Sequence, residues 1–346
     1  MNSLKKEYLG KLKFDTGQAA TLRAIGEYKG RQELFNRQIP ETLETLRTLA
    51  IIESTESSNR LEGVTAEPDR IRALVQRSAT PIGRSEGEIA GYRDALALIH
   101  EASGAHAFDV NTVKLLHTML YRYTSLRSGE WKSGDNVIIE RTPDGKIKER
   151  FRPVNASETP EAMRLLVERY AEALRGGGDP MVIVPLAVFD FLCIHPFMDG
   201  NGRVARLLTV LLLYHAGYQV ARYISLERII EESRETYYEV LERSSQGWHE
   251  GKHDIMPWLT YIWGVLIRAY KEFEERVGTI TTSWGSKSEQ VGLAVKRQLK
   301  PFAISDIENE CPGISREMIR HVLRQMRDKG EIRSTGIGRG AKWVRI

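Results

Sequence analysis

The sequence predicts a mainly α-helical protein with one β-hairpin and a small C-terminal winged helix-turn-helix domain. Through most of the first 276 residues, apolar residues recur at three- and four-residue steps, the spacing of amphipathic helices. One internal stretch, 134–153, instead has short extended runs around a Pro-Asp-Gly turn. After a stretch rich in Thr, Ser and Gly at 278–288, the pattern changes to short helices and then two strand-like runs.

Eight segments of the body fit helices. They are 40–61, 85–102, 109–121, 159–174, 182–194, 203–215, 225–244 and 256–276. The first carries leucines at three-residue steps and ends before Gly63, a typical helix stop. Ser85 and Glu88 are spaced as a capping box, and Asp109 is a candidate N-cap. The hairpin follows the third of these helices.

The C-terminal end differs from the body in charge as well as in pattern. Residues 304–329 resemble a helix-turn-helix, and 331–346 resemble a two-stranded wing. Residues 287–346 hold 13 Lys and Arg against 7 Asp and Glu, whereas the rest of the chain holds 37 against 39. Four arginines share one helical face there: Arg316, Arg320, Arg324 and Arg327. A recognition helix could present these arginines to DNA phosphates, but helix-turn-helix domains also dock proteins, and both alternatives stay open.

The most informative segment is 195–206, His-Pro-Phe-Met-Asp-Gly-Asn-Gly-Arg-Val-Ala-Arg. It joins an apolar helix to the next helix through a turn bracketed by glycines, and a helix N-terminus is a ready anion site. Arg203 and Arg206 lie on one face and suit phosphate oxygens. Asp199 is a hard ligand suited to Mg²⁺, and His195 suits a general base. These parts together indicate phosphoryl or nucleotidyl transfer.

The same twelve residues match the signature of the Fic (filamentation induced by cAMP) family at every defined position, and the resemblance extends over roughly residues 40–265. It implies AMP transfer from ATP to a Ser, Thr or Tyr hydroxyl of a protein. By matching position, His195 would be the general base and Asp199 would hold Mg²⁺. The phosphates would be bound by Gly200, Asn201, Gly202, Arg203 and Arg206, with Phe197 as a buried anchor. An intact Gly-Asn-Gly-Arg segment favours adenylylation over γ-phosphate transfer.

Residues 58–63, Ser-Asn-Arg-Leu-Glu-Gly, resemble the inhibitory motif that this family places before its catalytic core. Ser58 and Glu62 are four residues apart and share a helix face. The resemblance implies that Glu62 pairs with Arg206 and so turns the α-phosphate of ATP away from the target. In some relatives the same glutamate helps to remove AMP, so a de-AMPylating or bifunctional enzyme stays open.

Two further sets of residues enter through the resemblance. Tyr237 and Tyr238 lie on the helix that borders the adenine in this family, although an ordinary apolar helix face is an equal reading. The flap that docks the target peptide would include Val137, Ile138 and Ile139, and an ordinary hairpin strand is the equal alternative for these residues.

We therefore expect an N-terminal helical region with the inhibitory helix at 1–105, a Fic core at 106–277, a linker at 278–288 and the winged helix at 289–346. The competing functions are a nucleotide-sensing DNA-binding regulator and a transferase that moves another group. No apolar run reaches eighteen residues, and the two cysteines are far apart. These features favour a cytoplasmic protein without membrane contact, and a homodimer stays open.

Overall fold

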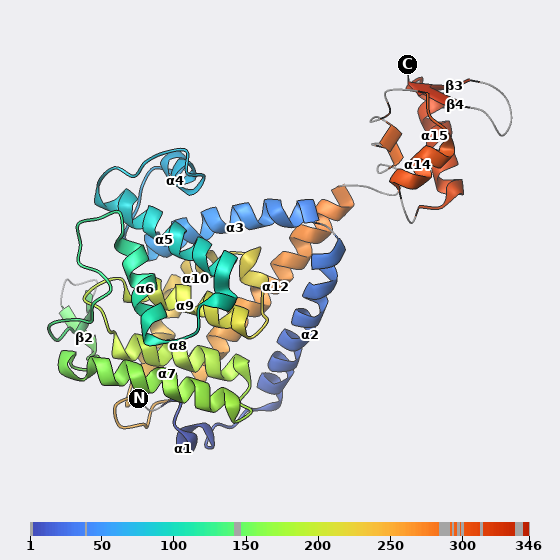
Figure 1. Ribbon diagram of the computed structural model, residues 1–346. Coiled ribbons are helices and arrows are strands. Elements are labelled where there is room, and N and C mark those ends of the chain that lie inside the picture. Colours follow the sequence, from blue (N-terminus) through green and yellow to red (C-terminus); the bar gives the residue numbers. More distant parts are fainter. Residues whose placement is uncertain are drawn as a thin grey trace. The chain divides into compact units, whose positions relative to one another are not determined.

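The computed structural model describes residues 3–38, 40–141, 147–283, 291–292, 294–295, 298, 301–311, 314–335 and 342–345. The chain forms two compact units, Met1–Phe273 and Glu274–Ile346. The first is helical apart from one hairpin, which confirms the predicted fold class (Figure 1). Its longer helices are α2 (Thr16–Gln38), α3 (Pro40–Leu61), α4 (Pro68–Val75), α5 (Gly83–Ala102), α6 (Val110–Tyr121), α7 (Thr159–Arg175), α8 (Pro180–Ile194), α9 (Asn201–His215), α10 (Leu226–Glu232), α11 (Arg234–Ser245) and α12 (Met256–Ser283). A short α1 (Lys6–Leu9) precedes them.

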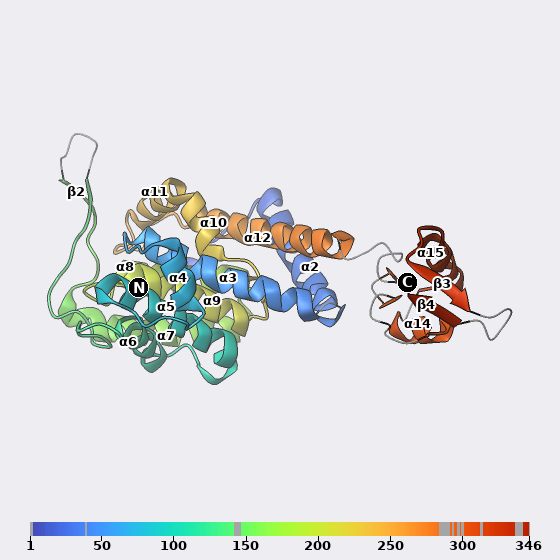
Figure 2. The ribbon, with the colours of Figure 1, turned by 90° about the horizontal axis from the view of Figure 1, so that it is seen from above.

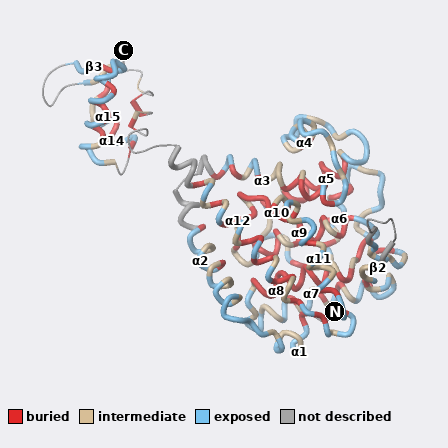
Figure 3. Tube along the Cα trace, turned by 180° about the vertical axis from the view of Figure 1, so that it is seen from behind, coloured by how far each residue is buried: buried red, intermediate tan, exposed pale blue. Residues whose placement is uncertain are grey.

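Helices α8 and α9 form the centre of the first unit. Almost every residue of α8 is buried, as its continuous apolar sequence predicts, and Figure 3 shows buried positions concentrated there. Helix α8 packs between α7 and α9, while α5 and α6 pack on α9. Helix α3 lies against both α5 and α10. The loop between α8 and α9 therefore emerges from the core, and α3 ends near it.

The hairpin consists of β1 (Ile138–Arg141) and β2 (Ile147–Phe151), which pair antiparallel. Figure 2 shows these strands extending away from the helical body. The predicted Pro-Asp-Gly turn at 143–145 lies outside the described residues. Within the described part of the chain, no helix combines the length and apolar character needed to cross a membrane.

Helix boundaries differ from the prediction at several places. The capping box at Ser85 is wrong: α5 already begins at Gly83, and the carboxylate of Glu86 accepts the Ile82 N–H at 2.8 Å. Glu88 therefore lies inside α5 and does not cap it, and its carboxylate accepts from Arg203 and Arg84 instead. Helix α9 begins two residues before Arg203. Helices α2 and α4 were not predicted at all.

Two predicted segments at the end of the body also differ. The single helix expected over 225–244 is two helices, α10 and α11, separated at Ser233. The Ser233 hydroxyl donates to the Ile229 carbonyl, a local bond that competes with a continuous helix. Helix α12 continues through Ser283 into the expected linker. Thr and Ser permit this, because each destabilises a helix by well under about 1 kcal/mol relative to Ala.

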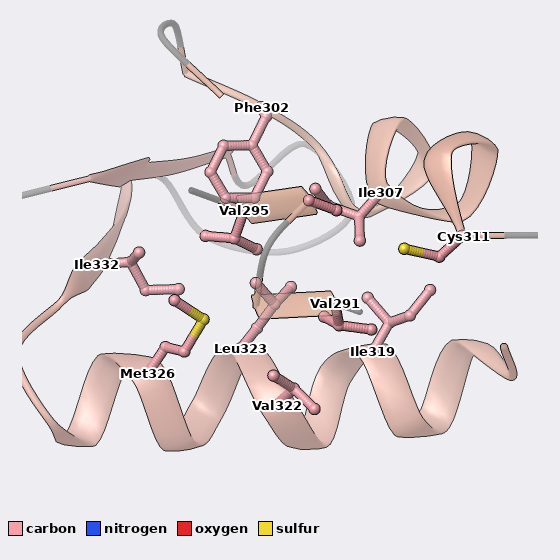
Figure 4. Close-up of a cluster of buried hydrophobic side chains, with 11 residues drawn as sticks. Val291, Val295, Phe302, Ile307, Cys311, Ile319, Val322, Leu323, Met326 and Ile332 are labelled. Carbon is pink, nitrogen blue, oxygen red and sulfur yellow. The ribbon is translucent and has the colours of Figure 1, made fainter. Parts of the chain in front are cut away.

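The second unit has its own hydrophobic core. Its described elements are α14 (Ile304–Glu310), α15 (Arg316–Asp328), β3 (Ile332–Thr335) and β4 (Lys342–Arg345). Figure 4 shows side chains of α15 meeting those of α14 and β3, with Phe302, Ile307, Leu323 and Ile332 among them. The order of two helices and then an antiparallel pair fits the winged helix-turn-helix expected from the sequence, which stays a prediction.

Candidate active site

His195 ends helix α8 in the left-handed region, with φ 52° and ψ 61°. A residue with a Cβ seldom adopts this conformation, so the surrounding packing holds the imidazole in place. Its Nδ1 lies 3.3 Å from the Leu192 carbonyl oxygen, an arrangement that leaves Nε2 as the proton acceptor. Burial lowers the pKa of His195 to about 4. The imidazole is therefore neutral near pH 7 and can accept a proton.

The loop after His195 is held from inside by Asn201. The Asn201 Oδ1 accepts the Phe197 N–H at 2.9 Å, and Nδ2 donates to the Phe197 carbonyl at 2.8 Å. Phe197 is fully buried, as expected of an anchor, and its ring stacks on His117 with centroids 3.8 Å apart. The side chain of Asn201 thus shapes the loop through Phe197.

Residues of α6 and the following segment support the same loop from outside. His117 Nε2 lies 3.2 Å from the Asp199 carbonyl oxygen, and its Nδ1 accepts the Gly129 N–H at 2.8 Å. Lys132 donates its backbone N–H to the Pro196 carbonyl at 2.8 Å and its Nζ to the Ile194 carbonyl at 3.2 Å. The sequence reading missed both residues, because neither stands in a recognisable local pattern.

Gly200 and Gly202 make room at the start of α9. Gly200 has φ 79°, where glycine is favoured, and a Cβ there would lie 2.8 Å from the Tyr121 hydroxyl. A Cβ on Gly202 would overlap the Glu62 carboxylate. The first backbone N–H groups of α9 have no partners within the helix and carry the positive end of its dipole. The turn therefore brings an anion site and the Glu62 carboxylate together.

Arg203 is buried, and both of its Nη atoms donate to protein groups, whereas its Nε has no hydrogen-bond partner within the described residues. Its Nη1 donates to Glu88 Oε2 at 2.5 Å and to Asn59 Oδ1 at 3.3 Å, and its Nη2 donates to the Tyr121 hydroxyl at 3.0 Å. Glu88 also accepts from Arg84 Nε at 2.6 Å. The structure thus shows Arg203 tying α9 to α3, α5 and α6. Its expected contact with phosphates stays a prediction.

Asp199 stands at the edge of the site with its carboxylate 58% exposed. Arg84 Nη2 lies 3.4 Å from one oxygen, and the Gly200 N–H donates to the other at 2.7 Å. Among the described residues, no cluster of three or more His, Cys, Asp or Glu could hold a metal by itself. A single exposed carboxylate still fits Mg²⁺, which usually takes one or two protein carboxylates and completes its shell with water and substrate phosphates.

Arg206 is held by the end of α3. Its Nε donates to the Ser58 hydroxyl at 2.8 Å, and its Nη2 donates to the Ser58 carbonyl at 2.9 Å and to Glu62 Oε1 at 2.8 Å. Burial alone would lower the pKa of Arg206, but the Glu62 carboxylate together with Tyr237 and Tyr92 outweighs this, so the pKa is raised. Its buried Nη1 has no hydrogen-bond partner within the described residues. The structure therefore brings Arg206 to Ser58 and Glu62, from which it is 148 and 144 positions away in the sequence.

A cavity of about 320 Å³ joins these groups. His195, Gly202, Arg206 and Glu62 line one part of it. Its other walls include Phe189, Leu192, Cys193, Leu241, Tyr237 and Tyr238. The Tyr238 hydroxyl also donates to the Leu61 carbonyl at 3.3 Å, so α11 contacts the end of α3.

The hairpin closes one side of this cavity. Val137 and Ile138 line it, whereas Ile139 is half exposed and does not. Arg150 of β2, which the sequence reading missed, donates to the Tyr238 carbonyl and to Glu242 of α11, both at 2.9 Å. These bonds fix the hairpin to the helix that carries the two tyrosines.

The fold and the site together define a mainly helical protein in which a neutral histidine, a helix N-terminus and a buried arginine face one cavity. The family model of the Fic/DOC family matches residues 107–213, so this chain carries a Fic domain. The matched range contains the whole segment from His195 to Arg206.

Similar proteins bear related names. "Protein adenylyltransferase Fic" of Nematostella vectensis is 24% identical over 218 residues, which are 59% of this chain and 44% of that protein. The protein of the same name in Drosophila melanogaster is 26% identical over 212 residues, which are 58% of this chain and 38% of that protein. The chain thus spans less than half the length of these curated relatives.

Solved structures share the fold. A Fic family protein from Desulfovibrio desulfuricans G20 is 20% identical, with 97% of each chain covered and a TM-score of 0.65. A Fic domain containing signaling protein from Bacteroides thetaiotaomicron is 22% identical, covers 75% of this chain and 97% of its own, and has a TM-score of 0.63.

Proposed function

We propose that this protein is an adenylyltransferase that moves AMP from ATP to a Ser, Thr or Tyr hydroxyl of a protein, and that Glu62 inhibits it. The observation that carries the proposal is the cavity in which His195, Gly202, Arg206 and Glu62 meet. The Fic domain and the names of the relatives support the same reaction. This chain matches less than half of the length of those proteins, so the activity and the target are proposals for this chain.

In the proposed reaction, the target hydroxyl oxygen forms a bond to the α-phosphorus of ATP, and the bond from that phosphorus to the bridging oxygen breaks. The proton of the hydroxyl passes to Nε2 of His195, and pyrophosphate leaves. His195 suits this role because it is neutral near pH 7 and its Nδ1 faces the Leu192 carbonyl oxygen.

The phosphates would lie at the N-terminus of α9, where backbone N–H groups bind anions. Asp199 would hold Mg²⁺, which neutralises phosphate charge when bound. Asn201 keeps the loop in shape through Phe197, and Arg203 keeps α9 in place through Glu88. Arg206 is then the arginine that can reach the outer phosphates, and its unpartnered Nη1 is a free donor for them.

Glu62 competes for that arginine. The Glu62–Arg206 pair neutralises the guanidinium, and the carboxylate lies against Gly202, where the phosphates would approach. We expect ATP to bind less productively while this pair is intact.

A second candidate activity is removal of AMP from a modified protein. It is supported by the position of Glu62, which lines the same cavity as His195 and is 28% exposed. A carboxylate there could orient a water molecule for attack on a phosphodiester.

The test is Glu62→Gly. We expect it to raise labelling of the protein itself or of a lysate from α-labelled ATP by at least about tenfold, the factor that corresponds to about 1.4 kcal/mol. Intact mass after incubation with Mg²⁺ and ATP should increase by one AMP, and His195→Ala should abolish the increase. Glu56→Gly is the matched control, because Glu56 lies on the same helix and pairs with Arg60.

Three results would count against the proposal. Unchanged labelling in Glu62→Gly would remove the inhibitory role. Label retained only from γ-labelled ATP would replace adenylylation with phosphoryl transfer. Release of AMP from a modified target by the unaltered protein, lost in Glu62→Gly, would favour the second candidate.

A further inference from the structure

Helix α15 of the second unit presents a strip of arginines beside its buried face. The buried face consists of Ile319, Val322, Leu323 and Met326. The arginines lie at positions 316, 320, 324 and 327, whose spacing keeps them on one strip along the helix, and all four are exposed. Packing of the unit therefore leaves this strip facing outward.

Only part of this strip is neutralised by nearby carboxylates. Arg316 Nε lies 3.4 Å from Glu308 Oε1, and Arg327 Nη2 lies 2.9 Å from Asp328 Oδ1. Arg320 and Arg324 have no ion pair with any described residue. Two adjacent guanidiniums at the middle of the helix are thus available to an external anion.

The β-hairpin adds cations on one face. In the register of β3 and β4, Thr335 lies opposite Lys342 and Arg333 lies opposite Val344. Since side chains alternate along a strand, Arg333 and Lys342 share the face opposite to the buried Ile332. Both are exposed. We call the six cations of α15 and the hairpin the basic surface: Arg316, Arg320, Arg324, Arg327, Arg333 and Lys342.

The charge of the second unit contrasts with that of the rest. The balance over 287–346 is 13 basic against 7 acidic residues, whereas the remainder of the chain is close to neutral. In the first unit, the arginines of the candidate active site are buried and paired with carboxylates. The basic surface is therefore a separate cationic feature that the proposed reaction does not use.

Duplex DNA matches this surface better than a compact anion does. A helix of thirteen residues is about 20 Å long and about 10–12 Å wide with its side chains, close to the width of the major groove, about 12 Å. Arginines one turn apart can reach successive backbone phosphates, and arginine forks suit phosphate oxygens. The arrangement of a second helix followed by a basic hairpin offers contacts to both the groove and the flanking backbone.

We propose that the basic surface binds double-stranded DNA, with Arg320 and Arg324 contacting phosphates. This activity goes beyond the proposed adenylyltransferase reaction and does not depend on it. Neutralising about four phosphates predicts a slope of about −3.6 for log affinity against log salt concentration.

The test is fluorescence anisotropy of a labelled mixed-sequence duplex of about 25 base pairs, titrated with the full-length protein. Between 50 and 200 mM salt the affinity should fall about a hundredfold. The double variant Arg320→Ala/Arg324→Ala should bind more weakly at 50 mM salt and should lower the salt slope by about 2. Arg23→Ala/Arg164→Ala is the matched control, because both residues are exposed helix arginines of the first unit.

Since Arg320 and Arg324 are exposed, the double variant should unfold at an unchanged temperature, which separates lost binding from lost folding. Absence of salt-dependent binding by the unaltered protein would overturn the proposal and leave protein docking. Equal weakening by the control variant would also overturn it, because binding would then reflect diffuse charge. Preferential competition by single-stranded DNA of the same length would remove the duplex as the ligand.

Discussion

At the scale of single residues, Glu88 binds Arg203 and so fixes the start of α9. It is 1% exposed and accepts hydrogen bonds from both Arg203 and Arg84. The sequence revealed the loop 195–206 because its parts are contiguous and each suits a phosphate site. It did not reveal Glu88, because the partner Arg203 lies 115 residues away and the local pattern pointed to a helix cap.

We predict that Glu88→Gln lowers the free energy of unfolding by about 3–5 kcal/mol, because it leaves the buried guanidinium of Arg203 without its counter-charge. Urea unfolding at pH 7 measures this. Glu86→Gln on the same helix is the control. Arg70, the partner of Glu86, is more exposed than Arg203, so we expect Glu86→Gln to lower the free energy of unfolding by about 1 kcal/mol or less. Equal losses in the two variants would show that Arg203 does not depend on Glu88.

At the scale of elements, Arg228 of α10 forms three ion pairs, one of which joins α10 to helix α3. Arg228 lies 3.1 Å from Glu53 of α3, 2.6 Å from Glu232 of α10 and 2.6 Å from Glu272 of α12. The leucine spacing of α3 predicted the helix itself. The crossing of α10 over it could not be predicted, because the break at Ser233 carries no Gly or Pro. The Ser233 hydroxyl there makes both the local bond to the Ile229 carbonyl and a tertiary bond to the Tyr261 hydroxyl at 2.8 Å.

We predict that Arg228→Ala loosens α3 relative to the rest of the first unit. The variant removes three ion pairs of a guanidinium that is 19% exposed. We expect the free energy of unfolding to fall by roughly 2 kcal/mol, which is less than for a fully buried network of ion pairs. Amide hydrogen exchange should become faster in α3 and stay unchanged in α7. Arg164→Ala is the control, since Arg164 pairs only within the exposed face of α7. If α3 exchanges no faster than in the control, Arg228 does not hold it.

At the scale of the whole molecule, burial keeps four histidines of the first unit uncharged. Burial lowers the pKa of His100 to about 3 and the pKa values of His117, His195 and His253 to about 4. Of these four, only His195 stands in a motif that the sequence links to a catalytic role. The burial of the other three follows from packing across distant segments, as when His100 Nδ1 meets the Tyr214 hydroxyl at 2.8 Å.

Because of these histidines, we expect the free energy of unfolding to decrease as the pH falls. Their folded pKa values lie below the unfolded value of about 6.5, so the unfolded chain binds more protons between pH 6.5 and about 4, and unfolding becomes easier as the pH drops. Each histidine contributes up to about 1.4 kcal/mol per pH unit in that window. Asp190 acts in the opposite direction, because burial raises its pKa.

Urea midpoints measured from pH 7 to pH 5 should therefore decline, before most carboxylates titrate. His100→Gln should make this decline less steep, because the chain would take up about one proton fewer on unfolding. Glutamine cannot bind the proton that an unfolded histidine gains. His215→Gln should leave it unchanged, since His215 is exposed on the neighbouring α9. A midpoint that stays flat from pH 7 to pH 5, or a decline that His215→Gln and His100→Gln change equally, would mean that the buried imidazoles do not set the acid sensitivity of the fold.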